Sequence, residues 1–199
     1  MLLDVRITPL PAKLVLKPYP PMVKMRKELY ILMYDIAKTH RDEAIKMDGN
    51  NQNEEIKHSM ICILFCYTCL EAFINTIGKD NFGKNWDTLE KSGTTERKWK
   101  AVSNELSTVK HGKPYSIFNK DKEPFKSFLK LEKIREDDLV HRKAYFSETV
   151  KTKYGNTEGM INVINAQTAI WACETVHSMV AELTANVDNP PSIEWAKLN

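Results

Sequence analysis

The sequence predicts an all-α fold: a bundle of about five helices, preceded by a short hairpin or an extended arm. Apolar residues recur three and four positions apart over several long segments, which is the spacing of one face of a helix. Clusters of glycine, proline and asparagine separate these segments. The chain has 199 residues, of which 42% are hydrophobic and 28% are charged, and this size and composition suit a single globular domain.

The first 21 residues depart from the helical pattern. Apolar residues alternate with others between Val5 and Leu16, and a proline-rich run over residues 18–21 then breaks the chain. Alternation of this kind is typical of extended segments. We therefore expect a hairpin or arm over residues 1–21, a helical domain over 22–187 and a tail over 188–199.

Two long helices are expected at the start of the domain. Helical spacing predicts the first from about residue 22 to residue 47, and the Asp-Gly-Asn-Asn segment at 48–51 supplies a turn. The second is predicted from about residue 53 to residue 77. Gly78 is the expected end of this helix, because helices often close with a glycine.

Three further helices are expected in the rest of the domain. They are predicted near residues 95–109, from about 123 past 135, and over about 158–185. Polar, turn-forming residues predict loops over 79–94 and 147–157.

The second helix has the clearest pattern and is apolar on two sides. One side is a continuous seam with alternating steps of four and three residues, and three cysteines with Phe73 fall on the opposite side. The seam consists of Ile56, Met60, Ile63, Tyr67, Leu70, Ile74 and Ile77. Such a helix must be enclosed, either by neighbouring helices or by a second copy of the chain, and we expect a homodimer.

A narrow polar stripe lies between the two apolar sides of the second helix. It consists of Lys57, Thr68, Glu71 and Asn75. Buried polar groups without partners are costly, so this stripe should face water, a cleft or a hydrogen-bonding neighbour. Glu71 is then either paired with an internal arginine or lysine, which is the commoner arrangement, or part of a functional site.

The four cysteines do not form the pattern of a disulfide framework or of a zinc site. Cys62, Cys66 and Cys69 lie in one apolar helix, with Cys173 far away in the sequence. Structural zinc sites usually take their ligands from short Cys-x-x-Cys turns, whereas cysteines in an apolar helix are usually small core residues. We therefore expect reduced thiols, no metal and no cofactor, in a cytoplasmic protein.

The longest apolar run, over residues 60–77, is not expected to cross a membrane. It contains Glu71, and a carboxylate near the centre of a spanning helix costs roughly 3 kcal/mol on insertion scales. A signal peptide is not expected either, because Asp4 and Arg6 interrupt the first eight residues. The run is predicted to be a buried helix.

The most specific segment follows the fourth predicted helix. Ile134-Arg135 is followed by Leu139-Val140-His141-Arg142-Lys143, with five residues between the arginine and the histidine. This pattern resembles the signature of the HEPN family (higher eukaryotes and prokaryotes nucleotide-binding domains). The run from Cys69 to Asn75 resembles the first core helix of that family. Lys98-Trp99-Lys100 and His111-Gly112-Lys113-Pro114 resemble its connecting region, so the resemblance covers about residues 55–180.

The resemblance implies a HEPN-like bundle acting as a metal-independent endoribonuclease in a homodimer, of the kind found in toxin–antitoxin or antiviral defence systems. Arg135 and His141 would be its catalytic residues. Histidine can transfer a proton near neutral pH, and arginine can grip two phosphate oxygens through its planar fork. Arg142 and Lys143 would attract RNA independently of sequence, although the net charge of +3 permits RNA without indicating it. The supporting residues would be Glu71, Asn75 and Asp137.

A second interpretation stays open. Many members of the family have asparagine directly after the arginine, whereas Glu136 and Asp137 follow here and could pair with Arg135. In a straight helix the six-residue step from Arg135 to His141 turns through about 600°, so the two side chains point in different directions. They come together only if the helix bends or if they meet across the interface of a dimer. The alternative is a non-catalytic HEPN-like scaffold that binds a nucleotide or a partner protein such as an antitoxin. A small-molecule-binding helical bundle is a third interpretation.

Overall fold

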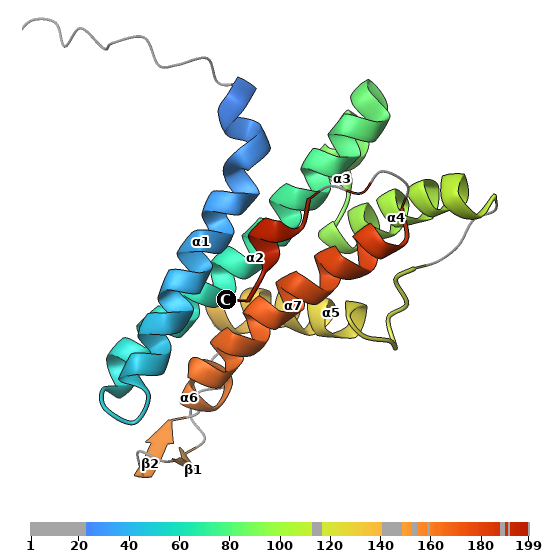
Figure 1. Ribbon diagram of the computed structural model, residues 1–199. Coiled ribbons are helices and arrows are strands. Elements are labelled where there is room, and N and C mark those ends of the chain that lie inside the picture. The colour runs from blue at the N-terminus through green and yellow to red at the C-terminus, as the bar shows by residue number, and fades with distance from the viewer. Residues whose placement is uncertain are drawn as a thin grey trace, which may run out of the picture.

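The structure is a computed structural model that describes residues 23–112, 117–140, 149–152, 155–158, 160–187, 190 and 192–198. Over these residues the fold is an all-α bundle, which confirms the predicted class (Figure 1). Its described part includes five helices of nine or more residues. The arm predicted over residues 1–21 lies outside the described residues.

The first two helices lie side by side and run in opposite directions (Figure 1). They are α1 (Val23–Met47) and α2 (Gln52–Phe82), and α1 confirms the first predicted helix to within a residue. Gly49, with a φ of 78°, turns the chain in a conformation that favours glycine. The Asn51 side chain then caps α2 by accepting a hydrogen bond from the Glu54 backbone N–H.

The leucines of α1 mark its outer face. Leu29 and Leu32 belong to the apolar spacing that predicted this helix, yet their side chains are 42% and 57% exposed. The buried side of α1 carries Tyr34, Ala37 and Ala44 instead. Small alanine side chains let α1 lie close to α2, so packing space rather than hydrophobicity selected the inner face.

The prediction that α2 ends at Gly78 is wrong. Gly78 is buried inside the helix because Trp86 packs directly on it, and a Cβ atom there would lie 2.3 Å from Trp86 Cε2. The helix continues to Phe82 and closes at Gly83, which has a φ of 55°. Gly78 therefore serves a close approach between helices, and Gly83 supplies the turn.

The two predicted loops contain regular structure. The first includes the end of α2, the 3-10 turn η1 (Gly83–Asn85) and α3 (Trp86–Ser92). The second includes β1 (Thr149–Thr152), which pairs in antiparallel register with β2 (Gly155–Glu158). Their polar sequences gave no periodic signal. Burial of Trp86 holds the first region in place, and backbone pairing of the strands holds the second.

The remaining helices complete the bundle. They are α4 (Thr95–His111), α5 (Phe125–Lys133), the single-turn α6 (Met160–Val163) and α7 (Ala166–Ala185). The single helix predicted over 158–185 is therefore split. Asn165 causes the break, because it is extended and its side chain accepts the Thr168 backbone N–H as the cap of α7.

A buried carboxylate on α2 fixes the start of α7. Glu55 is fully buried, and it accepts a hydrogen bond from the Ala166 backbone N–H at 3.0 Å. Ala166 is the first residue of α7, where the N–H has no partner within its own helix and where the helix dipole favours negative charge. This contact sets the position of α7 along α2.

Helix α2 is the centre of the core, with α1 and α7 on its cysteine side and residues of α4 and α5 on its Tyr67 side. The two apolar sides are thus covered within one chain, so this feature by itself does not require a second copy. The tail contributes as well. Trp195, in the 3-10 turn η4 (Glu194–Ala196), packs on Tyr30 and Phe73 with ring centroids 4.9 and 5.6 Å apart.

By length and composition alone, the helical stretch Gln52–Ser92 could cross a membrane. The central helix of a water-soluble bundle passes the same test, and α2 occupies that central place here. The stretch is therefore weak support for a membrane span.

Candidate functional site

The helix that carries Arg135 changes its winding at that point. α5 ends at Lys133 and continues into the π-helical turn η2 (Ile134–Val140), in which backbone hydrogen bonds span five residues instead of four. Such turns are rare, and they occur frequently at functional sites. The change of winding begins one residue before Arg135 and ends one residue before His141. This is the place where the sequence argument required a departure from a straight α-helix.

Arg135 is held against an aromatic ring. Its guanidinium carbon lies 4.5 Å from the centroid of the Tyr67 ring, a cation–π arrangement. Its Nη1 atom lies 3.5 Å from Glu136 Oε1, and the Arg135 side chain is 30% exposed. Arg135 is thus fixed at its base by Tyr67 and reaches solvent beside one carboxylate.

A chain of polar side chains is linked to the Tyr67 hydroxyl. The Tyr67 hydroxyl lies 2.9 Å from Glu132 Oε1 and 2.8 Å from Thr95 Oγ1. Thr95 in turn donates to Glu71 Oε1 at 3.3 Å, and the almost fully buried Lys98 ammonium lies 3.5 Å from the same oxygen. Helices α2, α4 and α5 each contribute to this chain, which we call the Tyr67 network.

Two groups of the Tyr67 network have raised pKa values. Burial raises the pKa of Tyr67, and burial also raises the pKa of Glu132 against the opposing effect of the Tyr67 hydrogen bond. When Glu132 carries a proton, it donates to Tyr67, Tyr67 donates to Thr95, and Thr95 donates to Glu71. Every hydroxyl then has one acceptor, and the charge of Glu71 is balanced by Lys98.

Of the predicted supporting residues Glu71, Asn75 and Asp137, the described contacts place only Glu71 in the Tyr67 network. Glu71 belongs to the Tyr67 network, with the internal lysine partner that the commoner arrangement required. Asn75 lies one turn further along α2, and its buried Oδ1 atom has no hydrogen-bond partner among the described residues. Asp137 is half-buried on η2. His141, Arg142 and Lys143 lie outside the described residues.

Sequence reasoning missed most of the groups that hold Arg135. Tyr67 was counted as part of an apolar seam, and Thr95 received no role. The pairing of Arg135 with an adjacent acid was expected, and Glu136 provides it. One signal was present: Glu132 lies three residues before Arg135, so the two share one side of a helix.

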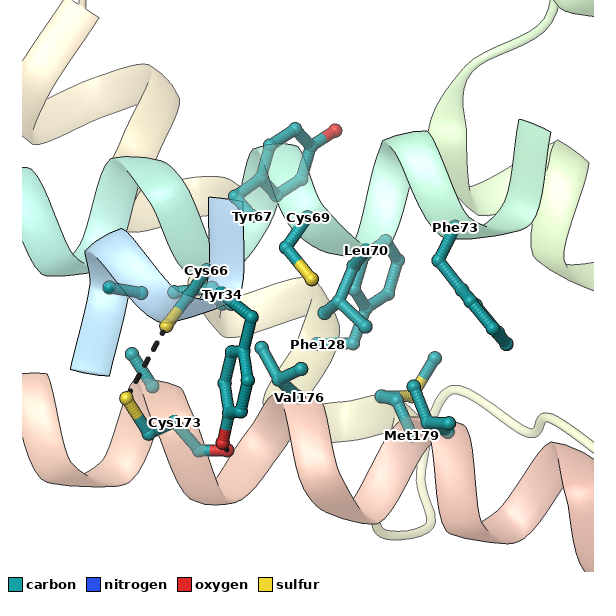
Figure 2. Packing of buried hydrophobic residues seen from close by; sticks show 14 of the residues in the cluster. Tyr34, Cys66, Tyr67, Cys69, Leu70, Phe73, Phe128, Cys173, Val176 and Met179 are labelled. Carbon is teal, nitrogen blue, oxygen red and sulfur yellow. Dashed lines mark hydrogen bonds between the residues drawn. The ribbon is translucent and has the colours of Figure 1, made fainter. Parts of the chain in front are cut away.

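The two buried sides of α2 are chemically distinct. In Figure 2 the Tyr67 side chain points to one side of the helix, and Cys66 points to the other, toward Cys173 on α7. The Tyr67 network and the cysteines therefore do not share a site.

Comparisons with protein-family models, with curated proteins and with solved structures found no match for this chain. The HEPN resemblance accordingly depends on the motif around Arg135 and on the order of the helices.

Proposed function

We propose that this protein is a HEPN-like endoribonuclease that cleaves RNA without a metal ion, with Arg135 and His141 as its catalytic residues. The observation that carries the proposal is the position of Arg135, stacked on Tyr67 at the start of the π-helical turn that leads into His141. Cleavage begins when a base removes the proton of a ribose 2′-hydroxyl and its oxygen attacks the adjacent phosphorus. The bond to the 5′-oxygen then breaks, and an acid protonates the leaving oxygen.

The residue types fit these steps. Histidine can act as the base or the acid near neutral pH. Arginine can stabilise the negative charge that develops on the phosphate, and an arginine already fixed on a ring loses little side-chain freedom when it binds. The contact with Glu136 is exposed and 3.5 Å long, and ion pairs of this kind are weak enough for a phosphate to replace. Arg142 and Lys143 would add attraction to the RNA backbone.

We also propose that the enzyme is a homodimer. Leu29 and Leu32 expose apolar surface on the outer face of α1, where no described part of the chain covers them. Light scattering at micromolar concentration should give twice the chain mass, and Leu32→Glu should give the single-chain mass. A monomeric parent chain would contradict the proposal.

The catalytic proposal is tested by substitution at the two residues. Arg135→Ala and His141→Ala should each lower RNA cleavage by roughly 10²-fold or more while leaving thermal unfolding almost unchanged. Arg135→Lys should not restore the rate, because lysine lacks the two-pronged geometry. A chelator should have no effect on the parent chain. Arg97→Ala removes an exposed arginine from α4 and serves as the matched control, with an unchanged rate. An unchanged rate in folded His141→Ala would end the ribonuclease proposal.

The second candidate function is a non-catalytic scaffold that binds a nucleotide or a partner protein such as an antitoxin. The ion pair between Arg135 and Glu136 favours it, since a neutralised arginine attracts phosphate less. Under this alternative RNA stays intact with or without chelator. In either case we expect a cytoplasmic protein.

A further inference from the structure

Three cysteine sulfurs form a nearly equilateral triangle in the core. Cys62 and Cys66 lie one turn apart on α2. Cys173 faces Cys66 from α7 (Figure 2). The Cys62 and Cys66 sulfurs are each 3.7 Å from the Cys173 sulfur and 4.0 Å from one another. All three residues are fully buried. Cys69, the remaining cysteine of α2, is equally buried but does not belong to the triangle.

These distances match those of thiolates bound to one metal ion. Sulfurs about 2.3 Å from a shared ion lie roughly 3.8 Å apart in tetrahedral geometry and roughly 4.0 Å apart in trigonal geometry. The side chains therefore need almost no movement to accept an ion at the centre of the triangle. The two helices that hold them are fixed in register by the contact between Glu55 and Ala166, so the triangle is preorganised.

The number and softness of the donors select the ion. No further cysteine, histidine or carboxylate joins the triangle in the described part of the chain. Structural zinc sites are almost always four-coordinate, whereas thiolates also favour Cu(I), a soft ion that a three-sulfur set can satisfy. Three sulfurs in an apolar core thus fit Cu(I) better than zinc.

A positive charge accompanies the triangle. Arg41 on α1 is only 9% exposed and pairs with Asp42 at 2.8 Å, and its charge acts on both Cys62 and Cys173. An ion that binds the three sulfurs displaces the thiol protons, and the Arg41 guanidinium offsets part of the negative charge that three thiolates leave around a monovalent ion.

We propose that Cys62, Cys66 and Cys173 bind one Cu(I) ion as three thiolates and that the ion ties α7 to α2. Three protons leave to solvent when the ion binds, and no electron is transferred. The sequence predicted no metal because helical spacing does not show that Cys173 completes a triangle while Cys69 is left out. The site lies on the opposite side of α2 from Tyr67, so it does not depend on the proposed ribonuclease.

The test is competition for Cu(I) against a chromophoric Cu(I) chelator, without oxygen and with a phosphine reductant. The parent chain should hold one equivalent. Cys62→Ala, Cys66→Ala and Cys173→Ala should each lower the affinity by more than roughly 100-fold, since even loss of an outer-shell partner costs 10- to 100-fold. Cys69→Ala is the matched control and should bind as the parent does. A parent that fails to hold Cu(I), or a Cys69→Ala chain that loses as much affinity as the other three, would overturn the proposal.

A second measurement uses only the parent chain, so it tests the site even if the cysteine variants do not fold. X-ray absorption of the Cu(I)-loaded chain should show three sulfur neighbours at about 2.3 Å. Nitrogen or oxygen neighbours in place of a sulfur would overturn the site. Neither readout involves RNA, so the outcome is separate from the test of Arg135 and His141.

Discussion

The two buried sides of α2 are stabilised in different ways, and their tyrosines show the difference. On the cysteine side, Tyr34 is fully buried and its hydroxyl donates to the Cys173 backbone carbonyl at 3.3 Å. On the other side, Tyr67 is 3% exposed, but its hydroxyl lies between Glu132 and Thr95. The Tyr34 contact ends at the backbone and fixes packing. The Tyr67 contact leads to ionisable groups and supports Arg135.

This difference indicates where function is expected. Packing of apolar groups stabilises a core without special requirements, whereas a buried polar network is favourable only when every member has a partner. The Tyr67 network satisfies its members from three helices and presents one arginine to solvent. Burying these polar groups costs desolvation free energy that a cluster of leucines does not cost. Fixing Arg135 is a functional reason to retain them.

The largest expected effect comes from removing the Tyr67 hydroxyl. Tyr67→Phe keeps the ring beneath Arg135 but leaves Glu132 and Thr95 without their shared partner. The free energy of unfolding should fall by about 1–3 kcal/mol. RNA cleavage per folded molecule should fall as well, by up to about 10²-fold, because the ring under Arg135 is no longer tethered. Urea unfolding and cleavage rates measure the two effects.

Tyr34→Phe is the matched control for this comparison. It removes a single longer hydrogen bond, so the free energy of unfolding should fall by about 1 kcal/mol or less. Cleavage per folded molecule should not change. If both variants reduced cleavage in proportion to lost stability, Tyr67 would have no positioning role and the contrast between the two sides would fail.

The sequence predicted the central helix and both of its apolar sides from spacing alone. It also identified Glu71 as a polar group needing a partner, and Lys98 supplies that partner from α4. It could not predict that Gly78 accommodates Trp86, because a helical glycine and a terminal glycine look the same until the packing is known.

The candidate site shows the same limit. The motif selected Arg135, but its support by Tyr67 joins residues 68 positions apart through helices from separate parts of the chain. The triangle completed by Cys173 likewise depends on the register between α2 and α7. Short-range spacing determines which residues share a face of one helix. It does not determine which faces of different helices meet.

The smallest expected effect is a difference in pH dependence at Glu132. Burial raises the pKa of Glu132, with the Glu136 carboxylate adding to the shift and the Tyr67 hydrogen bond opposing it. An unfolded glutamate titrates near ~4.3, so the folded protein binds this proton more tightly than the unfolded chain does. The contribution of Glu132 to stability is therefore full below that unfolded pKa and is lost as the pH rises through the folded pKa.

Glu132→Gln keeps a hydrogen-bonding group but cannot titrate. The unfolding free energy of the parent minus that of Glu132→Gln should consequently rise as the pH is lowered from about 7 toward 5, measured by urea unfolding. Glu43→Gln is the control and should give a flat difference over this range, because the hydrogen bond from Lys46 lowers the pKa of Glu43 and places its titration below it. A flat difference for Glu132→Gln would show that Glu132 is as well solvated as a surface carboxylate, and the protonated form of the Tyr67 network would then be wrong.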